Sequence, residues 1–173
     1  NCRLADILGR ERMGEQGHGW KKVVLSFRAF DPFWYGDWIV ADGDDPNVQL
    51  EPGEKDWIAV NNPGDTDAWP IIKIYGPIED PWVDLSAPGG ETMKEFVLSG
   101  FTVPAGRYVV VDTRPGRKSI ILDDGQNLYQ YLDANINELF SIPPGQYEVY
   151  LFGGLKDMNT KIVVEFQPPY WGV

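Results

Sequence analysis

Apolar and polar residues alternate along most of the chain with the period of a β-strand. The pattern begins at residues 21–30, where Val23, Leu25 and Phe27 share one face and mostly polar side chains share the other. A period of two predicts a strand with one buried face. Further short runs rich in β-branched and aromatic residues predict strands at 57–61, 70–75, 82–86, 92–98, 107–113, 118–123, 127–132, 146–152 and 161–166.

The predicted strands are separated by turn sequences in which a glycine closely follows a proline. Proline presets φ for the first central position of a turn, and glycine takes the positive φ that a type II turn needs next. The Asp124-Gly125 pair predicts a tight hairpin between residues 120–122 and 128–131. The proline-glycine turns are Pro63-Gly64, Pro88-Gly89, Pro104-Ala105-Gly106, Pro115-Gly116 and Pro144-Gly145.

Short strands with turns at this spacing predict an all-β fold, an antiparallel β-sandwich or jelly roll. Two segments break the pattern, because the apolar side chains of residues 4–12 and 133–140 recur at helical spacing. We therefore expect one or two short helices, the second as a helical turn that closes an edge of the sandwich.

The acidic, turn-rich segment at residues 41–55 is the expected domain boundary. We expect residues 41–173 to form the sandwich domain. Residues 1–40 are expected to be a connector and the closing strand of an upstream domain. The chain begins with Asn1, and we expect it to be a fragment or a processed product whose upstream part is missing.

The charge of the chain narrows the classes of partner. The formal net charge is −11, which weighs against nucleic acid and against insertion into an anionic membrane, because both would be repelled. The same charge also serves simple solubility. No apolar run is long enough to span a bilayer, and no signal-peptide pattern occurs. Cys2 is the single cysteine, so an internal disulfide framework is excluded.

The residue types argue against most catalytic chemistry. A nucleophile–histidine–acid triad needs a placed histidine, and His18 lies in a glycine-rich stretch before the sandwich. One histidine and one cysteine cannot fill a zinc site. The carboxylates at 42–45 and 65–67 leave a calcium site open, although turn formation is the favoured interpretation. No pair of acidic residues stands out for glycoside hydrolysis. We expect no enzyme activity and no cofactor.

Aromatic residues make up 13% of the chain, more than a core of this size needs, so some are expected to form a contact surface. The candidates for a protein-contact or glycan-binding face are Trp57, Trp69, Trp82, Tyr129 and Tyr131, with Tyr75, Tyr147 and Tyr150 also in or near strands. Tyr129 and Tyr131 are two apart and would share a face of a strand. The alternative is that these rings fill the core. If these rings are buried, a structural protein is favoured, whereas an exposed row of them favours glycan binding.

Several strings resemble the distal tail (Dit) and minor tail proteins of siphophages, in the family's order. They are FRAFDPFWYG (27–36), VNNPGDTDAWP (60–70), IIKIYGP (71–77), DTRPGRKS (112–119), DGQNLYQYL (124–132), LFSIPPG (139–145) and PYWGV (169–173). The resemblance implies a galectin-like or carbohydrate-module-like sandwich on the C-terminal side of a two-domain protein, after a belt-like domain. No predicted sandwich strand contains a histidine, so the galactoside site of galectins is not expected.

The resemblance also implies a function. In this family the upstream domains form a homo-hexamer ring at the tail tip, which links the tail tube to the host-adsorption apparatus. We therefore expect a structural component of the virion, made in the bacterial host cytoplasm, with other tail proteins as partners. The alternative from a different class is a carbohydrate-binding module that attaches a larger protein to a host cell-surface glycan.

Overall fold

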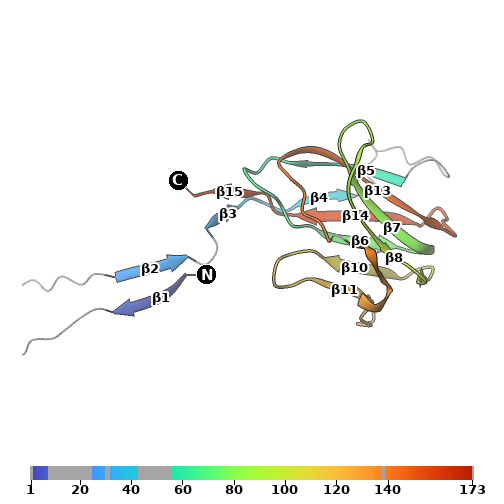
Figure 1. The fold of residues 1–173 in the computed structure, drawn as a ribbon, viewed down its shortest axis with the longest axis horizontal. Coiled ribbons are helices and arrows are strands. Elements are labelled where there is room, and N and C mark those ends of the chain that lie inside the picture. The colour runs from blue at the N-terminus through green and yellow to red at the C-terminus, as the bar shows by residue number, and fades with distance from the viewer. Residues whose placement is uncertain (1, 8–24, 30–31, 43–55, 138, 173) are drawn as a thin grey trace, which may run out of the picture. The chain divides into compact units, whose positions relative to one another are not determined.

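The computed structural model describes residues 2–7, 25–29, 32–42, 56–137 and 139–172, and the chain divides into two compact units (Figure 1). Unit 1 takes in residues 1–33 and 172–173, and unit 2 takes in residues 34–171. In unit 1, β1 (Cys2–Ile7) pairs antiparallel with β2 (Leu25–Ala29). The predicted strand at 21–30 is confirmed for residues 25–29, and its other residues lie outside the described part.

The helix predicted at residues 4–12 is wrong for residues 4–7, which belong to β1, whereas 8–12 lie outside the described residues. A helix this short is marginal without tertiary support. Pairing with β2 instead supplies hydrogen-bond partners to the backbone of this segment, from Cys2 opposite Ala29 to Ile7 opposite Leu25.

Unit 2 contains two larger antiparallel sheets (Figure 1). The five-stranded sheet has the order β11 (Ser119–Leu122), β10 (Tyr108–Asp112), β6 (Ile71–Tyr75), β14 (Lys161–Phe166) and β4 (Ile39–Asp42). The six-stranded sheet has the order β12 (Leu132–Asn137), β8 (Thr92–Leu98), β7 (Ile78–Ser86), β13 (Gly145–Gly154) and β5 (Asp56–Asn62), with β9 (Thr102–Val103) pairing to β7. A further two-stranded sheet joins β3 (Phe33–Tyr35) and β15 (Pro169–Trp171).

The inner faces of the two larger sheets form one hydrophobic core. Ile72 on β6 and Val109 on β10 are fully buried on the five-stranded side, and Phe96 on β8 and Val149 on β13 are fully buried on the six-stranded side. Phe140 adds a ring 5.9 Å from that of Phe96. β6 and β11 alternate buried and more exposed positions along their whole length, as expected where two sheets pack face to face. The predicted antiparallel β-sandwich is confirmed.

Eight of the nine strands predicted within unit 2 are confirmed with small shifts of their ends, as β5, β6, β7, β8, β10, β11, β13 and β14. The strand predicted at 127–132 is wrong, because Tyr129–Tyr131 form the 3-10 turn η1. The Asn127 side-chain oxygen accepts a hydrogen bond from the Tyr129 amide at 2.9 Å, which turns the backbone locally. The buried Leu128 anchors the turn, and its amide donates to the Ile120 carbonyl, so the chain does reverse after β11.

The helical turn predicted at 133–140 is also wrong, because residues 132–137 form the edge strand β12. Leu132 pairs with Leu98 of β8 and Asn137 with Phe96, with an irregularity between the two pairs. The open edge of β8 offers backbone partners that a single helical turn could not replace. Within the described part of the chain, η1 is therefore the one helical element.

The turn glycines behave as predicted at five of six positions. Gly89, Gly106, Gly116, Gly125 and Gly145 all have positive φ. Gly64 does not have a positive φ, and a glycine is needed there for another reason. A Cβ added to Gly64 would lie 2.6 Å from the backbone oxygen of Pro169 and 2.9 Å from the side-chain oxygen of Asn62. Glycine is needed there because two backbone segments approach closely.

Candidate functional site

Four aromatic side chains form a row on the outer face of the six-stranded sheet, and we call them the aromatic row. Trp57 comes from β5, Tyr150 and Phe152 from β13, and Trp82 from β7. Adjacent ring centroids are 6.1 Å apart from Trp57 to Tyr150, 5.8 Å from Tyr150 to Phe152, and 5.5 Å from Phe152 to Trp82. Tyr150 and Phe152 are stacked, with 4° between their planes. The row therefore crosses three neighbouring strands.

Strand alternation and register together produce the row. On β13, Val149 and Leu151 are fully buried in the core, so Tyr150 and Phe152 point to the opposite face. Antiparallel pairing then places Trp57 of β5 directly opposite Tyr150. On the other side of β13, Trp82 of β7 lies opposite Phe152. Directly opposite side chains are close enough to interact across a sheet.

The aromatic row is partly open to solvent. Trp82 is 39% exposed and Phe152 is 37% exposed, whereas Trp57 and Tyr150 are half-buried against their neighbours. The core on the other side of the sheet is filled by aliphatic residues and by Phe96, Phe140 and Phe166. The four rings are therefore available for contact and are not required to fill the space between the sheets.

Carboxylates lie beside the rings. The Tyr150 hydroxyl donates a 2.7 Å hydrogen bond to Glu148, and this bond, with burial and the charges of Glu148 and Asp84, raises the pKa of Tyr150 to about 12. Asp84 lies opposite Tyr150 on β7 and is buried. Its two oxygens accept hydrogen bonds from Ser86 at 2.9 Å and Thr92 at 2.6 Å. Glu148 therefore fixes the Tyr150 hydroxyl, and Asp84 adds a second negative charge beside it.

The structure brings together two of the five residues that the sequence singled out, Trp57 and Trp82. Trp69 lies elsewhere, between β5 and β6, with the Lys118 ammonium 5.7 Å from its ring centroid. Tyr129 and Tyr131 belong to η1, so the prediction that they share a strand face is wrong. Tyr131 packs on Phe101 with ring centroids 4.9 Å apart. A role of any of the five in binding stays a prediction.

Sequence reasoning did not select Phe152 and gave Tyr150 no particular place. The alternation of Glu148, Tyr150 and Phe152 with buried Val149 and Leu151 was a usable signal, because it puts both rings on one face of one strand. The positions of Trp57 and Trp82 beside them depend on strand order and register, which alternation does not encode.

The outer face of the five-stranded sheet is built differently, from charged pairs. Lys73 of β6 contacts Glu165 of β14 at 2.5 Å, and the hydrogen bond between them raises the pKa of Lys73 although burial opposes it. The Lys161 ammonium lies 5.3 Å from the ring centroid of Tyr75 and 3.5 Å from Asp42. Cationic groups here contact anionic or aromatic groups of the same face.

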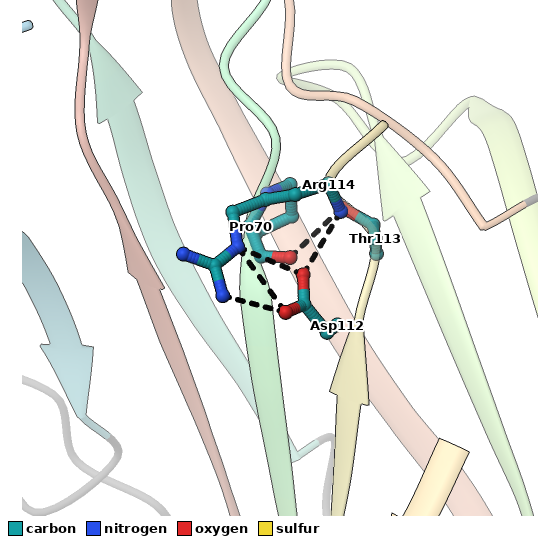
Figure 2. A network of polar contacts seen from close by, with 4 residues as sticks. All are labelled: Pro70, Asp112, Thr113 and Arg114. Atoms are coloured by element: carbon teal, nitrogen blue, oxygen red, sulfur yellow. Dashed lines mark hydrogen bonds and ion pairs between the residues drawn. The ribbon is translucent and has the colours of Figure 1, made fainter. Parts of the chain in front are cut away.

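Figure 2 shows a polar network at the end of β10, where the chain enters the turn at Pro115-Gly116. The Arg114 guanidinium binds Asp112 through Nε at 2.9 Å and through a terminal nitrogen at 2.6 Å. Burial raises the pKa of Asp112, but hydrogen bonds from the Arg114 side chain and amide outweigh it, and the net pKa is lowered. The Thr113 hydroxyl donates to the Pro70 carbonyl at 2.8 Å. Arg114 therefore stabilises this turn through its hydrogen bonds to Asp112.

Exposed aromatic residues also occur near β3 and β15 of unit 2. Trp34 is 72% exposed and Trp171 is 59% exposed, and Trp38 is exposed as well. Asp65 accepts a hydrogen bond from the Trp171 amide at 3.0 Å, and Asp67 accepts one from the Ser141 hydroxyl at 2.6 Å. These two carboxylates, which left a calcium site open in the sequence, thus have partners within the fold.

The described residues contain no group of three or more histidine, cysteine or acidic side chains placed to hold a metal ion. Residues 43–45 of the other acidic stretch lie outside that part. The described part of the chain contains no helix that is long and apolar enough to cross a membrane.

The sequence matches no protein-family model and no curated protein. Solved structures with a similar fold include two from phages. The crystal structure of the Dit protein (gp 19.1) of phage SPP1, described as a paradigm of the hub adsorption apparatus in phages infecting Gram-positive bacteria, is 16% identical with a TM-score of 0.60. The match covers 88% of this chain and 55% of that one.

The second structure is the baseplate of phage P2 in its activated conformation with Ca. The identity is 15% and the TM-score is 0.52, over 96% of this chain and 62% of that one. The chain therefore spans about three fifths or less of the proteins it matches. The resemblance to distal tail proteins is confirmed at the level of the fold.

Proposed function

We propose that this chain is a structural component of a phage or prophage tail, in the tail-tip hub that links the tail tube to the host-adsorption apparatus. The observation that supports it most is the match of 88% of the chain to the fold of a phage hub protein, with a second match to a phage baseplate. Both matched structures come from phage tail assemblies. Because fold does not determine function, the proposal needs a direct test.

The role we propose is assembly without catalysis. The partners are other tail proteins, namely the tube and the adsorption proteins, and the full-length protein forms a homo-hexamer ring. The chain is made in the bacterial cytoplasm and ends in the virion. The charged and aromatic outer faces supply two chemically different surfaces for such contacts. The domain border expected between residues 40 and 41 stays a prediction, and it falls within β4, a strand of the five-stranded sheet.

Immunogold labelling of intact particles tests the location. Antibodies raised against this chain are applied to virions, or to tails released after prophage induction, from the strain that encodes it. Label at the tail end away from the capsid is expected. Label on the capsid, or intact tails without label, would contradict the proposal. Antibodies against the major capsid protein are the control for particle integrity.

Light scattering after size exclusion tests the ring separately. The full-length protein is expected to have the mass of six chains, because the proposed hub is a closed symmetric ring. A monomer under the same conditions would overturn the hexamer and leave the location to be decided by labelling alone.

A further inference from the structure

We propose that the aromatic row is a binding site for a neutral saccharide, with pyranose rings packed on the open faces of Trp82 and Phe152. This inference goes beyond the structural role in the tail. It depends on the placement of Trp57, Trp82, Tyr150 and Phe152 on one outer face and on the polar groups beside them.

The position of the row within the sheet restricts the ligand. β13 has β5 on one side and β7 on the other, and β7 lies between β13 and β8. The backbone groups of both strands are therefore already paired along the row. At β13 and β7, which hold three of the four rings, a peptide therefore cannot be added as an extra strand, which is how extended chains usually bind a sheet edge. A ligand must bind through side chains that face outward.

The rings offer separate apolar surfaces and not one flat platform, because the planes of Trp82 and Phe152 are tilted by 55° and each ring can take a different pyranose. Tyr150 and Phe152 are stacked, and the Tyr150 hydroxyl is fixed by Glu148. Fixed side chains lose little conformational entropy on binding, so they make efficient contact surfaces. The negative face of an aromatic ring attracts the weakly positive C–H groups that cover one side of a pyranose. Trp82 and Phe152 are the two most exposed members of the row.

Polar groups lie where sugar hydroxyls would need them. Glu148 and Gln146 share the outer face of β13 with the row, and Asn61 lies opposite Gln146 on β5. The exposed Ala59 lies opposite Glu148 and leaves room between Trp57 and Asn61. An aromatic surface with a few polar groups that both donate and accept hydrogen bonds is typical of small-ligand sites.

Charge selects a neutral ligand over an anionic one. Glu148, Asp84 and Glu95 lie on this face, and the whole chain has a net charge of −11. A phosphate-rich or uronate-rich polymer would be repelled by this field, whereas a neutral saccharide is not. A cationic protein is the competing ligand class, and its binding would weaken steeply with salt.

A glycan array tests the proposal with the complete chain. The array displays neutral hexose and hexosamine oligosaccharides beside phosphate-bearing and uronate-bearing ones. Binding to neutral members, unchanged by added salt, is expected. Trp82→Ala and Phe152→Ala should each weaken the apparent affinity about tenfold or more, which corresponds to the loss of one stacking contact. Trp171→Ala and Tyr75→Ala, away from the row, are matched controls and should bind as the parent does.

Thermal unfolding of each variant separates loss of the site from loss of the fold. Either of two results would overturn the saccharide site: no binding of the parent chain to any neutral member, or equal binding by folded Trp82→Ala and Phe152→Ala. Binding only to anionic members, or binding abolished by salt, would also overturn it and point to an electrostatic partner. None of these results depends on where the protein lies in a tail.

Discussion

The two outer faces of the sandwich differ in the chemistry of their side chains. Both sheets alternate buried and outward residues, and both pack on one core. On the five-stranded sheet, the outward residues contact one another as charged pairs, such as Lys73 with Glu165. On the six-stranded sheet, the outward residues of β13 and its neighbours are rings with carboxylates beside them.

The difference teaches where new contacts can form. Two charged side chains that already contact each other gain little from binding a ligand, because the ligand must first replace that interaction. Exposed rings have unused apolar surface, and burying it stabilises a complex by about 25 cal/mol per Å² before the costs of association. The six-stranded face is therefore the better surface for recognition, whereas the five-stranded face is the better one for stability.

The largest expected effect tests the premise that both faces lie outside the core. Phe96→Ala should lower the free energy of unfolding by about 3–5 kcal/mol, because the ring is fully buried between the sheets. Urea denaturation measures it. Val97→Ala, the next residue and half-buried on the outer face, is the control and should cost far less. Equal losses would show that the outer face is part of the core.

The next prediction concerns the five-stranded face. Asp112→Asn should lower the free energy of unfolding by about 1–2 kcal/mol at neutral pH, through loss of the charged hydrogen bonds to Arg114. Since the folded pKa of Asp112 lies below its ordinary value of 3.8, its contribution is complete above that pH and is lost as the pH falls below it.

Urea denaturation of both proteins across the acid range measures this dependence. The difference between parent and Asp112→Asn should shrink in acid. Asp124→Asn, whose side chain is half exposed, should change stability less at every pH. A difference that stays constant into strong acid would mean that charge does not cause the effect.

A smaller effect is expected for the pair formed by Lys73 and Glu165. Their coupling energy in a double-mutant cycle with Lys73→Gln and Glu165→Gln should be about 0.5–1 kcal/mol, because both side chains are partly solvated. The raised pKa of Lys73 means that this contribution is present below pH 10.5 and is lost as the pH rises above it. Zero coupling at low salt would show that this charged pair does not stabilise the five-stranded face. The two outer faces would then differ less than their geometry indicates.

The smallest effect belongs to the aromatic row. Tyr150→Phe should change the free energy of unfolding by less than about 1 kcal/mol at neutral pH, because it removes one partly solvated hydrogen bond. The pKa of Tyr150 is raised from 10.0 to about 12, so its stabilisation is present below pH 10.0 and is lost as the pH rises toward 12.

Ultraviolet titration of tyrosinate detects this residue directly. The parent protein should show a tyrosine that ionises at about pH 12, and Tyr150→Phe should lack it. Tyr75→Phe, on the other sheet, should retain it. If Tyr150→Phe still shows a tyrosine that ionises at about pH 12, the Tyr150 hydroxyl is not held by Glu148, and the aromatic row lacks this fixed contact.

Much of the sandwich was determined by the sequence alone. The strands β8 and β14 begin and end where alternation predicts, at Thr92–Leu98 and Lys161–Phe166. The reason is local: one buried face imposes a period of two, and proline or glycine ends it. The same local chemistry misled at residues 127–131, where Asn127 bonds its own backbone and replaces a strand with η1.

Only the tertiary structure decided which segments meet. Residues 4–7 and 133–137 have helical spacing, yet each segment pairs with a neighbouring strand, residues 4–7 with β2 and β12 with β8 at Leu132 and Asn137, and this pairing decided the outcome. The aromatic row joins Trp57, Trp82 and Phe152, which are far apart in the chain, through the order and register of three strands. Alternation assigns each ring to a face, but it does not say which strands are neighbours, because pairing depends on contacts distant in sequence.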